Sequence, residues 1–129
     1  MEKRTFGNTG MKVTVLGYGA MEFRHVDENQ AGRLLESVLD AGINFIDTSP
    51  DYGPSEDRIG KWIAHRRGEY FLATKCGCNV PQQGGDDAPR HIWTGAQVRH
   101  NIEHSLKRLK TDYVDVWQVH SAEPAELAQ

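Results

Sequence analysis

The chain has 129 residues, of which 38% are hydrophobic and 26% are charged, and its formal net charge is −3. This composition is typical of a globular domain, and a chain of this length can bury roughly two thirds of its unfolded surface. The small negative charge, without a basic run, gives no electrostatic reason to expect nucleic acid or an anionic membrane as a partner. No apolar stretch is long enough for membrane insertion or export, so we expect a cytoplasmic protein.

The first part of the chain predicts a β-hairpin, a strand and a helix. A turn at residues 8–10, "NTG", separates two extended segments, and a strand is expected near residues 16–20. Apolar side chains then recur with helical spacing over residues 31–39. Asp27 and Gln30 form a capping pattern, which predicts that this helix begins directly after Asp27.

The middle of the chain repeats the alternation of strand and helix. The pattern predicts a strand over residues 43–47 and a helix that begins at Ser55 and ends in the basic residues 65–67 and Gly68. A strand over residues 69–75 follows. The next segment, residues 76–91, contains "PQQGGDDAP" and is expected to be a long surface loop. Its two cysteines are separated by one residue, which is too close for an ordinary disulfide and is typical of free thiols in a reducing compartment.

The last part of the chain predicts one more helix and one more strand. Thr94 and Gln97 suggest a capping box at the start of the helix. An apolar stripe over residues 98–109 should face the core, and basic residues crowd the last turn. The final strand is "YVDVWQVH", residues 113–120. No repeat or low-complexity tract divides the chain, so residues 1–129 are expected to form one domain.

Strands that alternate with amphipathic helices predict right-handed crossovers and a parallel α/β sheet, either doubly wound or part of a (β/α)8 barrel. Asp47, Lys75 and His120 each stand at the C-terminal end of a different predicted strand. In a parallel barrel those ends form one rim, where the chemistry of such folds takes place. The sequence therefore favours part of a (β/α)8 barrel, preceded by a short hairpin.

A dinucleotide-binding Rossmann motif is the alternative suggested by "GYGAME". Glu22 occupies the position where a third small residue is needed, and the next helix begins only near Asp27. No helix N-terminus would then meet a pyrophosphate directly, so this reading is disfavoured.

Tyr52 follows Asp47 closely and extends the predicted site. A free tyrosine phenol has a pKa of about 10, but a nearby cation stabilises the phenolate and makes proton exchange easier. Lys75 can be that cation, and Asp47 can keep the ammonium protonated in a partly buried site. His120 adds a donor that can hold a carbonyl oxygen. Such a set is suited to protonating an oxygen while hydride reaches the adjoining carbon, and hydride requires a nicotinamide cofactor.

The segments "GINFIDTSPDYGPSEDRIGKWI", "FLATKCG" and "LKRLKTDYVDVWQVH" resemble the N-terminal half of the aldo-keto reductases. The resemblance implies a (β/α)8 barrel that uses NADPH, less often NADH, and a catalytic tetrad of Asp47, Tyr52, Lys75 and His120, with Tyr52 as general acid. It also implies that Asp47 and the turn of Gly19, Ala20 and Met21 border the cofactor. The wording is closest to members that act on sugars, such as aldose or galactose dehydrogenases, so the expected substrate is a small carbonyl compound or sugar. Trp93 is the tryptophan expected to approach that substrate.

Members of that family have roughly 300 residues, so the resemblance covers a half-barrel that ends after the fourth strand. The sequence therefore leads us to expect a truncated fragment with a complete tetrad and an incomplete cofactor cleft. Unpaired strand edges predict self-association or a complementing C-terminal half. Low or absent NADPH-dependent turnover is expected of the chain on its own.

Several alternatives remain beside this interpretation. Asp47 could cap a turn, Tyr52 could be an ordinary loop aromatic and Lys75 a solvated strand end. Lys75 could instead form the Schiff base of an aldolase. His100 and His104, with the two cysteines, could suggest zinc, but no complete ligand set at familiar spacing is present, so no metal is expected. The chain could also be a non-enzymatic remnant or a binding subunit.

Overall fold

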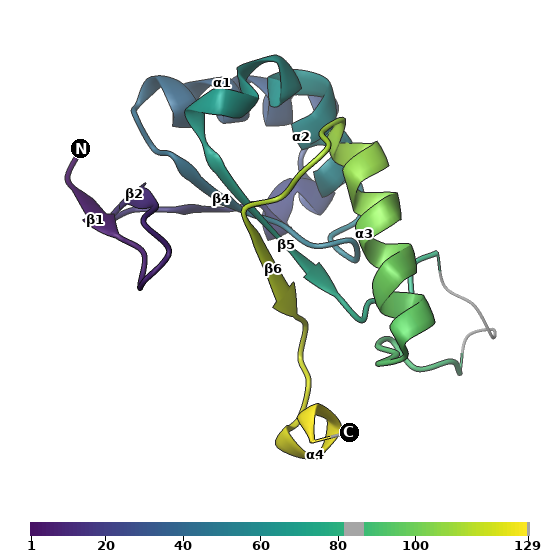
Figure 1. Cartoon of the computed structure of the whole chain (residues 1–129). Helices are drawn as coiled ribbons and strands as arrows, with labels where there is room; N and C mark the ends of the chain where they lie inside the picture. The colour runs from purple at the N-terminus through teal and green to yellow at the C-terminus, as the bar shows by residue number, and fades with distance from the viewer. Residues whose placement is uncertain (82–86, 129) are drawn as a thin grey trace.

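The computed structural model describes residues 1–81 and 87–128 as an α/β fold with helices packed on one side of a parallel sheet (Figure 1). The N-terminal hairpin pairs β1 (Lys3–Thr5) with β2 (Lys12–Thr14) in antiparallel register. The parallel sheet contains, in spatial order, β3 (Tyr18–Gly19), β4 (Phe45–Asp47), β5 (Phe71–Cys76) and β6 (Val116–Val119). The predicted hairpin and the predicted parallel sheet are confirmed.

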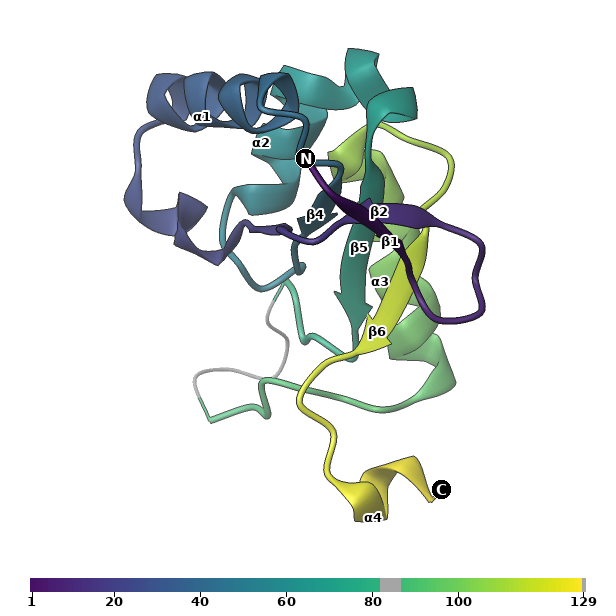
Figure 2. The same cartoon turned by 90° about the vertical axis from the view of Figure 1, so that its left-hand side faces the viewer.

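In the described part of the chain, four α-helices and two 3-10 helices accompany the strands, and the last of the α-helices follows the last strand. The α-helices are α1 (Glu28–Asp40), α2 (Ser55–Ile63), α3 (Gly95–Leu109) and the short α4 (Pro124–Leu127). The 3-10 helices are η1 (Met21–His25) and η2 (Ala64–Glu69). Figure 2 shows the hairpin crossing in front of β5 and β6, with α3 behind these strands. Within the described ranges, no helix is both long and apolar enough to cross a bilayer.

The register of the strands separates the core from the site. Ile46 pairs with Leu72, and both are fully buried beneath the helices. Because side chains alternate along a strand, Asp47 and Lys75 point to the opposite face from Ile46 and Thr74. Lys75 in turn lies in register with Gln118 on β6. The main core is made of Ala20, Phe23, Ala31, Leu35, Leu39, Ile46, Ile59, Ile63, Tyr70, Leu72 and Leu109.

The predicted start of the first helix is confirmed, whereas the predicted end of the second helix is wrong. The Asp27 carboxylate accepts a hydrogen bond of 2.8 Å from the backbone N–H of Gln30, as the capping pattern predicted. The second helix ends at Ile63, and the basic residues lie in η2. They form ion pairs with other elements there: Arg66 with Glu36 at 2.6 Å and Arg67 with Asp115 at 2.6 Å.

Three further differences concern β3, η1 and α3. The predicted strand over residues 16–20 is only two residues long, and η1 follows it where the sequence pattern gave no helix. On α3, Asn101, Ser105 and Leu109 are buried, while most of the predicted apolar stripe is half-buried. The Asn101 amide explains part of this, because it donates to the Cys78 carbonyl and accepts from the Gly77 N–H.

The parallel strands and their right-handed helical crossovers form the N-terminal half of a (β/α)8 barrel. In the part of the chain that the structure describes, β3 and β6 are the outer strands of the sheet, and each pairs with one neighbour. Trp117 and Val119 on β6 are 39% and 50% exposed. The predicted loop over residues 76–91 starts one residue later than expected, because Cys76 is the last residue of β5. Cys78 pairs with His91 where the loop returns, and residues 82–86 lie outside the described part.

Candidate active site

Asp47 and Lys75 meet at the C-terminal ends of β4 and β5. The Lys75 Nζ donates to Asp47 Oδ2 at 2.7 Å and to the Thr48 carbonyl at 2.8 Å. The second carboxylate oxygen, Oδ1, accepts from Gln118 Nε2 at 2.8 Å. The Lys75 side chain is only 11% exposed, so its charge is compensated mainly by Asp47. Gln118 orients the carboxylate, and the sequence interpretation did not include it.

Tyr52 lies over the ammonium group of Lys75. The Lys75 Nζ is 4.8 Å from the centroid of the phenol ring, within the range of a cation–π contact. On the other side, the Tyr52 ring meets the His120 ring edge to face, with 5.9 Å between centroids. The structure thus brings the four tetrad candidates Asp47, Tyr52, Lys75 and His120 together on one rim.

The turn that carries Tyr52 is fixed from behind by α3. The Arg108 guanidinium donates to the Pro50 carbonyl at 3.1 Å and to the Gly53 carbonyl at 2.6 Å. Gly53 itself has a φ of +56°, a conformation that glycine adopts without the steric cost of a side chain. This turn precedes α2 directly, so the first turn of α2 and the position of Tyr52 depend on the same contacts.

His120 directly follows β6 and is held by its backbone N–H, which donates to the Cys76 carbonyl at 3.1 Å. Its Nδ1 lies 3.2 Å from Ser49 Oγ, 3.3 Å from Cys78 Sγ and 3.5 Å from Asp51 Oδ1. Burial lowers the pKa of His120 below its ordinary value, although the Asp51 carboxylate opposes that change. The imidazole is therefore neutral at pH 7, with one ring N–H available as a donor.

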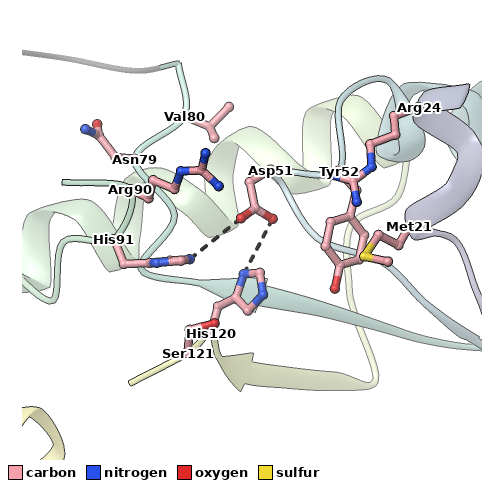
Figure 3. Close-up of a pocket in the computed structure, with 10 residues that line it drawn as sticks. All are labelled: Met21, Arg24, Asp51, Tyr52, Asn79, Val80, Arg90, His91, His120 and Ser121. Atoms are coloured by element: carbon pink, nitrogen blue, oxygen red, sulfur yellow. Dashed lines mark ion pairs between the residues drawn. The ribbon is translucent and has the colours of Figure 1, made fainter. Parts of the chain in front are cut away.

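A cavity of about 550 Å³ opens beside Tyr52 and His120 (Figure 3). Its ten lining residues are Met21, Arg24, Asp51, Tyr52, Asn79, Val80, Arg90, His91, His120 and Ser121. The sequence interpretation missed most of them, including Asp51 and His91. Asp51 stands one residue before Tyr52, so its position in the turn was the available signal. Nothing in the sequence around His91 indicated that the long loop returns to this rim.

The three residues proposed to border a cofactor occupy the end of β3 and the start of η1. Gly19 and Met21 are exposed at this end of the sheet, and Met21 also lines the cavity. Ala20 is fully buried between neighbours: its N–H donates to the Asp47 carbonyl at 2.8 Å, and its carbonyl accepts from Ser55 Oγ at 3.0 Å. A ligand at the rim can therefore contact Gly19 and Met21, while Ala20 shapes the backbone beneath it.

Trp93 is not among the residues that line this cavity. Its ring stacks on the His91 ring at 5.7 Å and 4°, and it packs against the backbone of Gly77. His91 therefore separates Trp93 from the open space. Contact between Trp93 and a substrate stays a prediction.

The geometry described above agrees with what comparison to known proteins finds. The sequence profile described as "Aldo/keto reductase family" matches residues 15–126. The chain belongs to the aldo/keto reductase family. The resemblance inferred from the sequence motifs is thereby confirmed, and so is the half-barrel fold.

Relatives in the family include sugar-related enzymes. L-galactose dehydrogenase of Arabidopsis thaliana is 38% identical over 138 residues, covering 100% of this chain and 41% of that protein. The 6-dehydroglucose reductase of Novosphingobium aromaticivorans is 32% identical over 143 residues, covering 98% of this chain and 45% of that protein. The holo form of aldo-keto reductase AKR11C1 from Bacillus halodurans superimposes with a TM-score of 0.82 at 35% identity, covering 92% of this chain and 40% of that structure. The chain therefore spans less than half the length of these relatives.

Proposed function

We propose that this chain supplies the catalytic rim of an NAD(P)H-dependent aldo-keto reductase, acting in the cytoplasm on a small aldehyde, ketone or sugar. The observation that supports the proposal best is the series of contacts that links the four side chains at the C-terminal ends of the strands. Asp47 pairs with Lys75 at 2.7 Å, Lys75 lies under the Tyr52 ring at 4.8 Å, and the His120 ring meets Tyr52 at 5.9 Å. A phenol, a cation and a neutral imidazole beside one open cavity suit reduction of a carbonyl group.

Each residue has a separate role in this proposal. A nicotinamide cofactor, when bound, would supply the hydride that the carbonyl carbon receives. Tyr52 donates the proton to the carbonyl oxygen, and the Lys75 ammonium stabilises the phenolate that remains. Asp47 keeps Lys75 charged and in place, and the neutral His120 donates a ring N–H that orients the carbonyl oxygen. Reversal of the same steps would oxidise an alcohol.

Gly19, Met21 and Asp47 are the residues of this chain that we propose to border the nicotinamide end of the cofactor, with Ala20 in support. Gly19 and Met21 are both exposed, so a bound ligand can reach them. Asp47 is 32% exposed on its side chain, so it can also meet a ribose hydroxyl. We expect NADPH in preference to NADH on the basis of family membership.

The substrate class rests on the relatives. Two of the similar proteins are described as L-galactose dehydrogenase and 6-dehydroglucose reductase, so a sugar carbonyl is the first class to test here. The cavity has polar and charged groups on several sides, among them Arg24, Asp51 and Arg90, which suits a ligand with several hydroxyl groups. The alternative function is binding without turnover, as a subunit that pairs with another chain through the exposed edges of the sheet.

The test compares Tyr52→Phe with Tyr113→Phe in a completed barrel. Residues 1–128 would replace the matching N-terminal part of the Bacillus halodurans reductase, and NADPH oxidation would be followed with a panel of aldoses and simple aldehydes. We expect turnover that falls by about 10²–10⁴-fold in Tyr52→Phe, the range typical of a general acid. Tyr113 is 48% exposed, so Tyr113→Phe should retain activity. Equal activity in both variants would refute the role of Tyr52, and no turnover in any folded chimera would favour the binding function.

A further inference from the structure

Four potential metal ligands converge at the side of the cavity formed by His91 and His120. Asp51, Cys78, His91 and His120 each offer one donor atom, and these four atoms all lie within 4.8 Å of one another. They come from four separate places: the turn after β4, the loop after β5, the return of that loop, and the end of β6. Figure 3 shows Asp51 between the rings of His91 and His120. The cluster is distinct from the Asp47–Lys75 pair at the end of β4 and β5.

Some of the distances within the cluster are close to those around a tetrahedral cation, and none between the four donor atoms exceeds 4.8 Å. Ligand atoms at ordinary Zn–N, Zn–O and Zn–S bond lengths are separated by about 3.4–3.6 Å in a tetrahedron. Cys78 Sγ is 3.3 Å from His120 Nδ1. Of the two Asp51 oxygens, Oδ1 lies 3.5 Å from His120 Nδ1 and Oδ2 lies 3.6 Å from His91 Nε2. The backbone thus already places these atoms close to the spacing that a bound ion requires.

One member of the cluster is short of a hydrogen-bond partner. His91 Nε2 is buried and accepts or donates no hydrogen bond among the described residues, although it points toward Asp51. Its ring cannot easily turn away, because Trp93 stacks on one face at 5.7 Å and His120 meets it edge to face at 4.9 Å. A buried nitrogen lone pair held in this way is costly unless something binds it.

We propose that Asp51, Cys78, His91 and His120 form a binding site for one borderline or soft divalent cation, with Zn²⁺ the best match. A thiolate, two imidazoles and one carboxylate are ligands that zinc accepts, whereas Mg²⁺ and Ca²⁺ prefer oxygen ligands alone. The ligand set differs from the one weighed from the sequence, because His100 and His104 lie outside it and Cys76 is not a member.

Binding of the ion requires the Cys78 thiol to lose its proton. Burial raises the pKa of the Cys78 thiol to about 11, so the thiol is protonated in the metal-free protein at pH 7. The ion displaces that proton to solvent and takes the sulfur lone pair, so each Zn²⁺ bound releases one proton and no electron is transferred.

The site is compatible with the proposed role of His120 without depending on it. A cation on Nδ1 leaves the ring proton on Nε2, and Figure 3 shows this second nitrogen on the side of the ring nearer Tyr52. The metal would therefore fix the tautomer that donates toward the cavity. Because metal binding can be measured without cofactor or substrate, it can be tested separately from reductase activity.

The test uses the metal-free full chain and two matched pairs of variants. Zn²⁺ would be titrated by calorimetry, and Co²⁺ would report a thiolate ligand through its sulfur-to-metal charge-transfer band. We expect one ion per chain. Cys78→Ser should abolish the band. It should also weaken Zn²⁺ affinity by at least roughly 10–100-fold, the loss that is typical when a residue supporting a metal ligand is removed. Cys76→Ser, which changes the other buried cysteine, should retain both.

The second pair distinguishes this cluster from the stacked histidines on α3, whose ring centroids are 5.6 Å apart. His91→Gln should weaken Zn²⁺ binding by a similar factor, and His100→Gln should not. Because the His91 side chain is 22% exposed, this variant keeps the test valid if Cys78→Ser fails to fold. The proposal is overturned if the wild-type chain binds no Zn²⁺, if His91→Gln binds as well as wild type, or if His100→Gln loses as much affinity.

Discussion

Replacing Arg108 with alanine is expected to destabilise the protein strongly, because Arg108 compensates a buried carboxylate. Glu56 is fully buried, and its Oε2 lies 3.4 Å from Arg108 Nη1, while the Arg108 side chain is 12% exposed. At an effective dielectric constant of 20, two unit charges at this separation attract by about 5 kcal/mol. Removing one partner of a buried pair typically costs about 3–5 kcal/mol, and we expect Arg108→Ala to fall in that range.

Because Arg108 pairs with Glu56, the effect of Arg108→Ala should depend on whether Glu56 is present. In Glu56→Gln the neutral amide needs no cation, and Thr74, which donates to Glu56 Oε1 at 2.7 Å, can still bind the side-chain oxygen. Arg108→Ala should therefore cost clearly less in the Glu56→Gln background than in the wild type. Urea denaturation of the four proteins, followed by circular dichroism, gives this coupling energy as a double-mutant cycle. Arg99→Ala, an exposed position on the same helix, should change stability by less than about 0.5 kcal/mol.

The pH dependence provides a second check on the same residues. Burial raises the pKa of Glu56 above its ordinary value, and Arg108 opposes that change. Without Arg108 the folded-state pKa rises further, so the folded protein binds a proton that the unfolded chain releases. The free energy of unfolding of Arg108→Ala should then increase as pH falls from neutral toward the pKa of about 4.3 that Glu56 has in the unfolded chain. The difference in stability between the wild type and Arg108→Ala should therefore become smaller at lower pH. The reasoning would be refuted if Arg108→Ala lowered the free energy of unfolding equally in both backgrounds, or if its stability difference from the wild type did not change with pH.

Further predictions concern packing, titration and the hairpin. Gly60→Ala places a Cβ 2.1 Å from the Arg108 carbonyl oxygen and should destabilise by about 1–3 kcal/mol in thermal melts, whereas Gly95→Ala meets nothing within 4 Å and should be neutral or stabilising. Asp51→Asn should lower the pKa of His120 further, because the Asp51 carboxylate raises it; an NMR titration that moved upward would contradict this. Asn44→Ala removes the acceptor of a buried backbone N–H at 2.7 Å and should cost about 1–3 kcal/mol in urea denaturation.

The parts of the fold that follow from local chemistry could be predicted from the sequence. The Asp27 cap, the hairpin turn and the polar ends of successive strands each depend on a few neighbouring residues. The end of α2 could not be placed in this way, because Arg66 and Arg67 resemble a helix terminus in sequence but bind carboxylates from other elements. Their ion pairs depend on how the elements pack, which local patterns do not contain.

The same distinction applies to the candidate site. Asp47, Lys75 and His120 were found because each ends a strand, and the ends of parallel strands meet by construction. Gln118 was missed although it stands in register with Lys75, since a glutamine in a strand carries no signal of its own. Asp51, Cys78 and His91 come together only through the path of the loop after β5, and no periodicity describes that path.

Gly77 and Trp93 constrain how this sequence can change during evolution. A Cβ at Gly77 would lie 1.8 Å from the Trp93 ring, and the φ of +86° at Gly77 is a conformation that other residues rarely adopt. Because Trp93 also stacks on His91, a substitution at position 77 would displace both rings together. We therefore expect positions 77 and 93 to covary among close homologues: glycine should accompany a large aromatic residue, and a side chain at position 77 should appear only where position 93 has become small.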